Sequence, residues 1–321
     1  MCLLLIRTVA ILLAMLGMTA LAQDFPWKPM RIIVPTSVAT TSDLTARFIA
    51  EQMTKELKVS VVVENKSGAN GILGVTEFLA APHDGHTLLL TNSSLYANPT
   101  LYKKIPYDPV KDFRILVGVN QVFLIMVASP SFNVNSIRQL VEYAKERPNQ
   151  VTYASASIGS STHTGPELFA SRAGIKLRHI PYKGGAQAIV DVSGGHVNIA
   201  MTAVPTAAPL VASGKLKALA VTGPHRSALL PDVPTLAESG IAGAEVISKQ
   251  SIVASVDIPE GAAARLTVVI SRILNTPEYA KFLASNGIEK ELIPPEFYSK
   301  IGADELKRWA EMVNISGAKI D

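Results

Sequence analysis

Two kinds of apolar segment alternate in the first third of the chain, and this alternation restricts the possible folds more than any other feature. Short apolar runs, typical of buried strands, occur at 31–35, 59–64 and 87–91. Between them, at 43–58 and 72–80, apolar residues recur at helical spacing. Strands that alternate with helices in this way form a parallel sheet covered by helices, so we predict an α/β fold.

A second α/β unit follows the first. Its expected elements are helix 136–146, strand 151–155, helix 167–173, strand 177–180, helix 186–193, strand 197–201, helix 205–213 and strand 216–221. Closing helices are expected at 262–274, 277–285 and 295–315. A turn-rich passage at 99–113 and two extended apolar segments, 123–127 and 246–254, separate the units. The pattern predicts two lobes with a cleft between them, joined by two crossing strands, although no sequence repeat of fixed period relates the lobes.

The length of 321 residues agrees with two domains, because a single core stops growing at about 250 to 300 residues. We assign residues 23–125 and 248–321 to lobe 1 and residues 126–247 to lobe 2. The chain would thus enter and leave the second lobe through the two crossing strands.

Residues 1–22 have the order of a secretory signal peptide. Arg7 precedes an apolar run, and Ala20-Leu21-Ala22 forms a small-x-small cleavage site. The competing interpretation is a membrane anchor, but the run is short for a bilayer and polar residues follow at once. We expect cleavage after Ala22 and a periplasmic protein. The single cysteine, Cys2, would be removed, which excludes disulfides, thiolate metal sites and cysteine nucleophiles.

The charge distribution gives no sign of a nucleic-acid partner. The formal net charge is +4, and removal of Arg7 with the signal peptide leaves +3. Basic residues are scattered and form no stripe with interleaved aromatic residues, so we expect no nucleic-acid binding. A slightly positive exported protein suits small anionic solutes, although net charge is weak evidence for any ligand.

The hydroxyl-rich loop that follows strand 151–155 is the main candidate for a binding site. Ser157, Ser160, Ser161 and Thr162 surround Gly159 just before a predicted helix. A helix N-terminus with free backbone N–H groups favours an anion, so a carboxylate would fit there. The alternative is an ordinary helix cap, which serine and threonine supply routinely.

Two loops of the first unit are further candidates, because ligands of open α/β sheets lie beyond the carboxyl ends of the strands. One loop follows strand 31–35 and leads into helix 43–58, with Ser42 as the expected N-cap and Asp43 in the first turn. The other follows strand 87–91 and contains Ser93.

Three short motifs have competing explanations. Gly68, Gly71 and Gly74 match neither dinucleotide nor phosphate-loop spacing, so we expect a turn and a close helix approach. His83 and His86 flank an Asp-Gly turn without a third ligand nearby, so we expect a surface turn and no metal or other cofactor. A hydrolase pair of Ser161 with His163 lacks the G-x-S-x-G context, although distant residues could still converge on either side chain.

Lys249 interrupts the apolar segment 246–254, where a core side chain would be expected. It either points outward from an edge strand or faces the cleft, where its ammonium group could pair with a carboxylate. Asn120 and Gln121 present the same two possibilities in the other crossing segment.

The sequence resembles the Bug-type periplasmic solute receptors, the substrate-binding proteins of tripartite tricarboxylate transporters, over nearly its whole mature length. Order and spacing agree at 29–35, 61–69, 84–90, 98–109, 153–156, 180–184, 214–220 and 230–238. The resemblance implies a two-lobed binding protein of the type II class that closes like a Venus flytrap on a small carboxylate. It also implies membrane permease subunits as partners, a monomeric receptor and no enzymatic activity.

In such receptors the loop after the first strand and the Ser/Thr-Gly loop of the second lobe hold one carboxylate. The two loops that the resemblance implies, together with Ser93 from the strand-end argument and Thr202 and Lys249 from positions that differ from the family, give the expected ligand-binding residues: Ser37, Ala39, Thr40, Thr41, Ser42, Asp43, Ser93, Ser157, Gly159, Ser160, Ser161, Thr162, His163, Thr202 and Lys249.

Three positions depart from the family pattern. Residues 38–43 replace a Pro-Gly-Gly-Gly-Thr-Asp sequence, residues 201–203 replace Phe-Asp-Asn and so delete an acid, and Lys249 stands where many relatives have tryptophan. Fewer acids and one more base suit a ligand with two carboxylates, aliphatic or aromatic, and disfavour an amino group. Two alternatives stay open: a ligand sensor for a signalling partner, and a secreted hydrolase.

Overall fold

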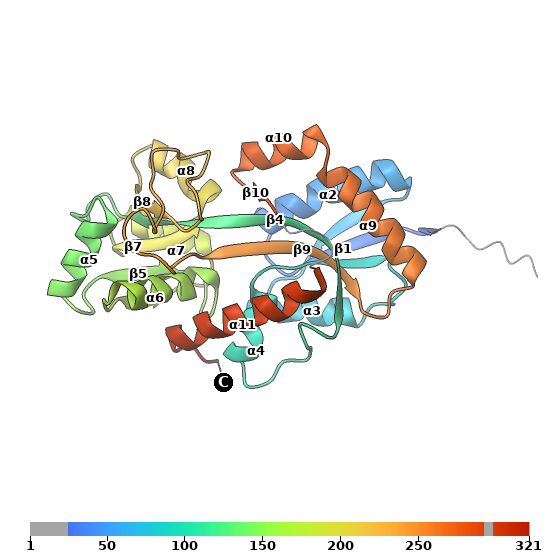
Figure 1. Ribbon diagram of the computed structural model, residues 1–321, viewed down its shortest axis with the longest axis horizontal. Helices are drawn as coiled ribbons and strands as arrows, with labels where there is room; N and C mark the ends of the chain where they lie inside the picture. Colours follow the sequence, from blue (N-terminus) through green and yellow to red (C-terminus); the bar gives the residue numbers. More distant parts are fainter. Residues whose placement is uncertain (1–24, 292–297, 321) are drawn as a thin grey trace, which may run out of the picture.

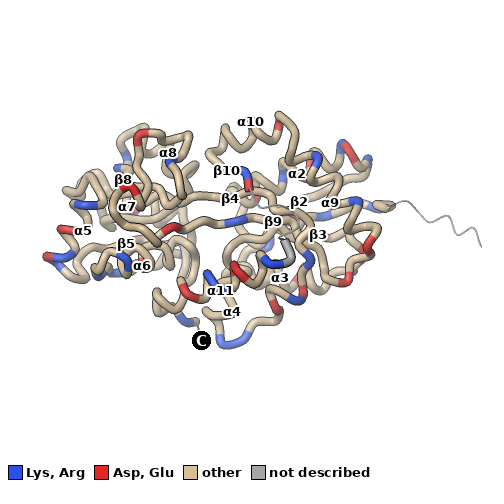
Figure 2. Tube along the Cα trace, viewed as in Figure 1, with Lys and Arg blue, Asp and Glu red and all other residues tan. Residues whose placement is uncertain are grey.

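In a computed structural model of the protein, residues 25–291 and 298–320 are described. The predicted signal peptide and its cleavage after Ala22 lie outside these residues. Two lobes lie side by side and are joined by long strands, as predicted (Figure 1). Lysine, arginine, aspartate and glutamate residues are spread along the chain in both lobes (Figure 2). No helix within the described ranges combines the length and the apolar character needed to cross a bilayer.

Lobe 1 contains a parallel sheet in the order β2-β1-β3 with helices on both faces. Its N-terminal elements are β1 (Met30–Val34), α2 (Thr41–Leu57), β2 (Val61–Asn65), the 3₁₀ turn η1 (Ala69–Gly71), α3 (Ile72–Leu79), β3 (Thr87–Leu90) and α4 (Ser94–Leu101). The chain returns to this lobe near its end with α9 (Glu260–Leu274), α10 (Pro277–Asn286) and β10 (Glu289–Lys290).

Lobe 2 repeats this architecture with the parallel order β6-β5-β7. It consists of α5 (Ile137–Glu146), β5 (Thr152–Ser155), α6 (Ser161–Ala173), β6 (Arg178–Pro181), α7 (Gly185–Ser193), β7 (Ile199–Ala203), α8 (Val204–Ala212) and β8 (Lys217–Val221). The predicted α/β character therefore holds in both lobes.

Two antiparallel strands, β4 (Phe113–Ala128) and β9 (Ile247–Ser255), connect the lobes. With 16 residues, β4 reaches about 50 Å, which is enough to belong to both lobe sheets. The path β2-β1-β3-β9-β4-β7-β5-β6 is therefore continuous, and β8 and β10 also pair with β4. The loops at the carboxyl ends of the lobe strands meet around this crossing.

The last helix, α11 (Tyr298–Ser316), packs against α4 of lobe 1 and α6 of lobe 2. Its Trp309 is completely buried in an apolar cluster that also contains Leu89 of lobe 1 and Phe169 of lobe 2. Each lobe also has a cluster largely of its own. The lobes are therefore joined by shared core packing as well as by strands.

The passage expected to be turn-rich from residue 99 is partly helical, because α4 extends to Leu101 and contains Pro99. Proline cannot donate the helical hydrogen bond to the carbonyl of Leu95. The hydroxyl of Tyr107 donates to that carbonyl oxygen instead, at 3.3 Å. A side chain eight residues further along thus compensates for the proline.

The helices that follow the two predicted ligand loops begin earlier than expected. Helix α6 begins at Ser161, although residue 167 was expected, so half of the hydroxyl loop forms its first turn. Helix α2 begins at Thr41, and its N-cap is Thr40, whose hydroxyl accepts the Asp43 N–H. The prediction of Ser42 as the N-cap is wrong by two residues.

The glycine explanation is confirmed, because a Cβ atom on Gly74 would lie 2.9 Å from the Lys66 carbonyl oxygen. The surface-turn explanation is wrong for His86, which is 3% exposed and packs edge-on against Phe25 and Trp27. His83 is the exposed member of the pair. The described residues hold no cluster of three or more His, Cys, Asp or Glu side chains suited to a metal ion.

Candidate functional site

The predicted ligand loops of lobe 1 lie against the crossing strand β9. Ser42, in the first turn of α2, accepts a hydrogen bond from the Gln250 side-chain amide at 3.0 Å. Ser93, just before α4, lies 3.5 Å from the hydroxyl of Ser248. Both loops therefore reach the place where the two lobes meet.

The loop before α2 is closed by its own side chains. Ala39 has a left-handed backbone (φ 61°), and its N–H donates to the Asp43 carboxylate at 2.9 Å. Thr40 donates to the Ser37 carbonyl at 3.0 Å. Burial raises the pKa of Asp43, but hydrogen bonds from Arg47 and from the Ala39 N–H outweigh it and leave the pKa lowered. The first turn of α2 therefore already holds a negative charge.

The loop before α6 uses its hydroxyls differently. Ser160, the N-cap, donates to the Ser157 carbonyl and lies 2.8 Å from the Thr162 hydroxyl, but it caps no backbone N–H. Thr162 accepts the N–H of Ala156 at 2.9 Å. Within the described contacts, the N–H groups of Ser161 and Thr162 have no acceptor. The N-terminus of α6 is therefore open to an anion.

The backbone N–H of Gly159, which was predicted to donate to the ligand, makes a different hydrogen bond in the structure. Gly159 has a positive φ of 76°, and its N–H donates to His163 Nδ1 at 3.0 Å. This N–H is therefore already used inside the loop. Glycine is needed here for a second reason, since a Cβ atom would lie 2.1 Å from Leu101 Cδ2 of α4. The second loop thus touches lobe 1 directly.

Three aromatic rings stack behind the second loop. The ring centroids of His163 and His179 are 3.9 Å apart, and that of Tyr153 lies 4.8 Å from His179. Burial lowers the pKa of both histidines to about 4, and His179 lowers the pKa of His163 further. His163 is therefore neutral at pH 7. Because Nδ1 accepts from Gly159, its proton is on Nε2.

The suggested pair of Ser161 with His163 does not form within the described contacts, because His163 Nδ1 is occupied by Gly159. The serine–histidine contact that does exist joins Ser155 Oγ to His179 Nε2 at 2.6 Å. Ser155 is only 1% exposed, and the lowered pKa of His179 makes that ring a weak base. This contact therefore supports the loop, and the Ser155 hydroxyl is too deeply buried to act as an exposed nucleophile.

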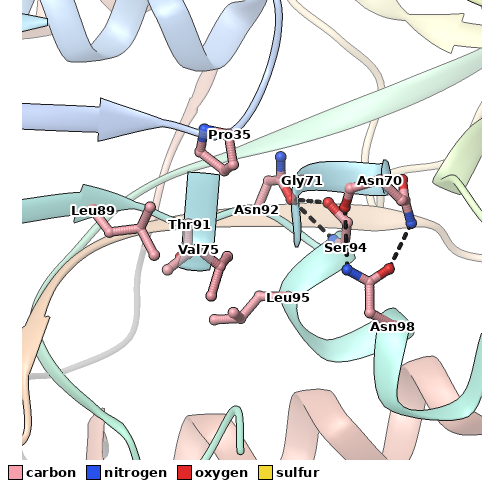
Figure 3. A pocket seen from close by; sticks show the side chains of 10 residues that line it. All are labelled: Pro35, Asn70, Gly71, Val75, Leu89, Thr91, Asn92, Ser94, Leu95 and Asn98. Carbon is pink, nitrogen blue, oxygen red and sulfur yellow. Dashed lines mark hydrogen bonds between the residues drawn. The ribbon is translucent and has the colours of Figure 1, made fainter. Parts of the chain in front are cut away.

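A small cavity beside the lobe 1 loops is filled by amide side chains (Figure 3). Asn92 accepts hydrogen bonds from the backbone N–H and the hydroxyl of Ser94. Asn98 accepts from the Asn70 amide at 2.8 Å and donates to the Asn70 carbonyl at 3.1 Å. These bonds fix the turn η1 and the start of α4, so the cavity supports the loops.

Lys249 is held by an acidic partner. Its ammonium group lies 2.9 Å from the Glu305 carboxylate of α11, whose side chain is 4% exposed. Glu305 also accepts from the indole of Trp309 at 2.9 Å. Glu291 is 8% exposed, and its two carboxylate oxygens have no hydrogen-bond partner among the described residues. Arg308 lies 3.5 Å from the Glu305 carboxylate as well, so Lys249 is the nearer of two cations beside two buried acids.

The remaining predicted positions lie nearby but in separate contacts. Thr202 is buried on β7, opposite Ile125 of β4. Asn120 is buried and donates to Thr45 of α2 at 3.1 Å, whereas Gln121 is half-buried. No described hydrogen bond or ion pair links Thr202 or Lys249 to the two loops.

Sequence reasoning missed several groups that shape this site. Glu305 lies on helix α11, and Glu291 directly follows the two-residue strand β10. His179 lies on strand β6, and Leu101 ends helix α4 in a passage that was expected to be turns. Of these four residues, Glu305 alone had a usable signal in the sequence: it lies four residues before Trp309 on one helix, a spacing that brings the two side chains together. The other contacts depend on tertiary packing.

The sequence profile described as "Tripartite tricarboxylate transporter family receptor" matches residues 45–317. Among relatives, the protein BugT of Bordetella pertussis is 33% identical over 98% of both chains. These similarities extend over both lobes.

Solved structures are similar over the same extent. Rpa4515 of R. palustris, solved with adipate, has a TM-score of 0.85 and 28% identity over 92% of this chain and all of its own. The periplasmic binding protein BugD has a TM-score of 0.81 and 32% identity over 92% and 99%. MatC (Rpa3494) of Rhodopseudomonas palustris, solved with malate, has a TM-score of 0.79 and 26% identity over 90% and 100%.

The profile match, the whole-length relative and the shared two-lobed fold lead to one assignment. The resemblance inferred from the sequence is confirmed, and the chain belongs to the receptor family of the tripartite tricarboxylate transporters, as a Bug-type solute receptor.

Proposed function

We propose that this protein is an exported, monomeric receptor that captures a small dicarboxylate between its lobes and delivers it to the membrane subunits of a tripartite tricarboxylate-type transporter. The lobes would be residues 23–125 with 248–321, and residues 126–247. Two similar receptors were solved with adipate and malate, which are both dicarboxylates, and this supports the ligand class.

The observation that carries the proposal is the uncapped N-terminus of α6. Its free N–H groups lie beside the hydroxyls of Ser160, Ser161 and Thr162, and a helix N-terminus is a natural site for a carboxylate. The side chain of Ile158, 40% exposed, borders this site. The loop therefore combines donors for a carboxylate with an apolar edge.

The ligand site in this proposal comprises the residues inferred from the sequence, with the donors of lobe 2 as its main contacts. Ser37, Ala39, Thr40, Thr41, Ser42 and Asp43 would face the ligand from the first loop, and Ser93 from the second loop of lobe 1. Thr202 would border it from β7. Gly159 and His163 would act through their mutual hydrogen bond.

Lys249 would contact the second carboxylate of the ligand, but Glu305 would already neutralise part of its positive charge. Its ammonium group already pairs with Glu305, although 23% of the side chain stays exposed. An ammonium group has three donors, so two remain for a ligand. We therefore expect Lys249 to orient a dicarboxylate and to contribute less affinity than a free lysine would.

The proposal is tested by differential scanning fluorimetry of the mature protein against mono-, di- and tricarboxylates, amino acids and sugars. A ligand that binds only the native state raises the melting temperature; a hundredfold excess over Kd adds about 2.7 kcal/mol. We expect the largest shifts with dicarboxylates. Shifts with amino acids or sugars alone would contradict the anion site.

The transporter role needs a separate experiment. Deletion of the gene should abolish uptake of the radiolabelled dicarboxylate that gives the largest shift, and re-expression should restore uptake. Unchanged uptake with intact ligand binding would favour the alternative of a ligand sensor for a signalling partner.

A further inference from the structure

The two ligand loops have the same internal hydrogen bonds, although no sequence repeat of fixed period relates the lobes. Each position in the second loop equals its counterpart in the first plus 120. Ala39 and Gly159 are the left-handed residues, with φ of 61° and 76°. Thr40 and Ser160 are the N-caps, and their hydroxyls donate to the carbonyls three residues earlier, at 3.0 and 2.8 Å.

The repeat includes the side chain that closes each loop. The N–H of the left-handed residue donates to the side chain four residues later, which is Asp43 in one loop and His163 in the other, at 2.9 and 3.0 Å. Both acceptors lie in the first turn of a helix, and both are nearly buried, at 3% and 5% exposure. Asp43 and His163 therefore occupy equivalent places.

The charge of these two acceptors differs. Asp43 is ionised, and it pairs with Arg47, whose side chain is 52% exposed. His163 is neutral, because burial lowers its pKa to about 4. The positive end of a helix dipole, roughly half a charge, is thus balanced internally in α2 and left unbalanced in α6.

The number of free donors does not distinguish the two helices. The N–H of the third residue is accepted by the Thr40 hydroxyl in α2 and by the Ser160 carbonyl in α6, so two N–H groups stay free in each first turn among the described contacts. The two termini therefore differ in charge: a carboxylate lies beside the free donors of α2, and a neutral imidazole lies beside those of α6. A ligand carboxylate is attracted by the second arrangement and repelled by the carboxylate of the first.

We propose that Asp43 and His163 divide the work between the loops, so that the α6 loop holds the ligand carboxylate and the α2 loop supplies only neutral donors. His163 is then a positioning residue whose neutrality the site requires. This inference rests on the proposed function, because it assigns the carboxylate of that same ligand to one lobe.

The first test places an aspartate in the second loop. His163→Asp keeps an acceptor for the Gly159 N–H but adds a negative charge beside the proposed carboxylate. At an effective dielectric of about 20, two like charges about 6 Å apart lower affinity about 100-fold. Isothermal titration with adipate and malate measures the change. His163→Asn, which is neutral, should recover most of the loss.

The matched control adds the same charge to the same helix. Ser171 is exposed near the end of α6, eight residues beyond His163 and about 12 Å further along the axis. Ser171→Asp should leave the affinity within about twofold of the wild type, because its charge is distant and solvated. Circular dichroism checks that each variant is folded.

The second test does not depend on the stability of an aspartate at position 163. Asp43→Asn keeps an acceptor for the Ala39 N–H and removes the negative charge. If the Asp43 carboxylate lies about 12 Å from the ligand carboxylate held at the α6 loop, adipate should bind about tenfold more tightly to the variant. A purely structural role for Asp43 predicts weaker binding, since the contact with Arg47 is lost.

Each outcome decides between the alternatives. Loss with His163→Asp, recovery with His163→Asn and gain with Asp43→Asn support the inference. Equal losses with both His163 variants, or weaker binding with Asp43→Asn, would overturn it while leaving the receptor function intact. A wild-type protein that binds no carboxylate in the fluorimetry panel would overturn the proposed function as well.

Discussion

Two buried polar clusters differ in charge: the one behind the α6 loop is neutral, and the one under α11 contains an ion pair and a second acid. Behind the α6 loop, Tyr153, His163 and His179 form a neutral stack, and each ring makes one side-chain hydrogen bond, to Glu167, Gly159 and Ser155 respectively. Under α11, Lys249 and Glu305 form an ion pair, and the two carboxylate oxygens of the nearby Glu291 accept no hydrogen bond from the described part of the chain.

The difference shows what burial costs in each case. Neutral groups that are hydrogen-bonded are tolerated in a core, whereas a buried charge without full compensation is expensive. The neutral cluster should therefore be insensitive to small changes and to pH near 7. The charged cluster should dominate the stability of the interlobe region, and four experiments test this contrast.

The largest effect is expected from Lys249→Met, because Glu305 keeps only the longer contact with Arg308, at 3.5 Å, and Glu291 loses the cation that lowers its pKa. Removing one partner of a buried ion pair costs about 3 to 5 kcal/mol. Urea unfolding at pH 8 measures the free energy. Lys290→Met is the matched control, since the Lys290 side chain is exposed and, among the described contacts, donates to the neutral Asn275 side chain at 2.9 Å. Equal losses in the two variants would remove the contrast.

Glu291→Gln should have a pH-dependent effect of the opposite sign. Burial raises the pKa of Glu291 from 4.5 to about 7, with a further rise from Glu305 that Lys249 opposes. A raised pKa means that its contribution is present below pH 4.5 and is lost as pH rises through 7. On the order of 3 kcal/mol is lost by pH 8.

In the Glu291→Gln variant this loss should disappear, so that the variant is more stable than the wild type at pH 8 and similar at pH 5. Urea unfolding across this range measures the slope. Glu289→Gln, two residues earlier on β10, should keep the wild-type slope. The same slope in all three proteins would show that Glu291 is not the responsible group.

The histidine stack should lose stability on the acid side. Burial lowers the pKa of His163 from 6.5 to about 4, so its contribution is present above pH 6.5 and is lost as pH falls toward 4. The loss at pH 5 relative to pH 8 is about 2 kcal/mol. The NMR signal of the His163 ring should not titrate between pH 8 and 5. A midpoint near 6.5, as in an unfolded chain, would contradict a neutral stack.

The smallest effect is expected from Tyr153→Phe. The Tyr153 hydroxyl donates to Glu167 at 2.5 Å, and Glu167 is half-buried, so water replaces part of the lost bond. The expected cost is about 1 kcal/mol, as for a typical hydrogen bond. Thermal unfolding at pH 7 measures it. A loss as large as that of Lys249→Met would mean that the neutral cluster also carries an uncompensated charge.

The sequence predicted the order of the elements well, because strand and helix periodicity is local. It predicted helix starts poorly at prolines. The expected turn-rich passage began at Pro99 and an expected helix began directly after Pro166, but both prolines lie inside helices. In α4 the hydroxyl of Tyr107 replaces the missing donor, and no local pattern reveals a partner of that kind.

The candidate site was predicted in part for the same reason. Ser160, Thr162 and Thr40 could be recognised because hydroxyls before a helix have a local meaning. The partner of Lys249 could not, because Glu305 is 56 residues away in sequence and reaches β9 only through the packing of α11. The binding roles of these residues stay predictions until ligands are tested.

The position of α11 also has a consequence for the time course of folding. This helix follows both lobes in the chain and fills a cluster that they share, so neither lobe can complete that cluster until α11 has been synthesised. Chains usually fold from the N-terminus as they emerge. Here the cluster shared by the two lobes must wait for α11, so the completion of both lobes is coupled to a single late helix.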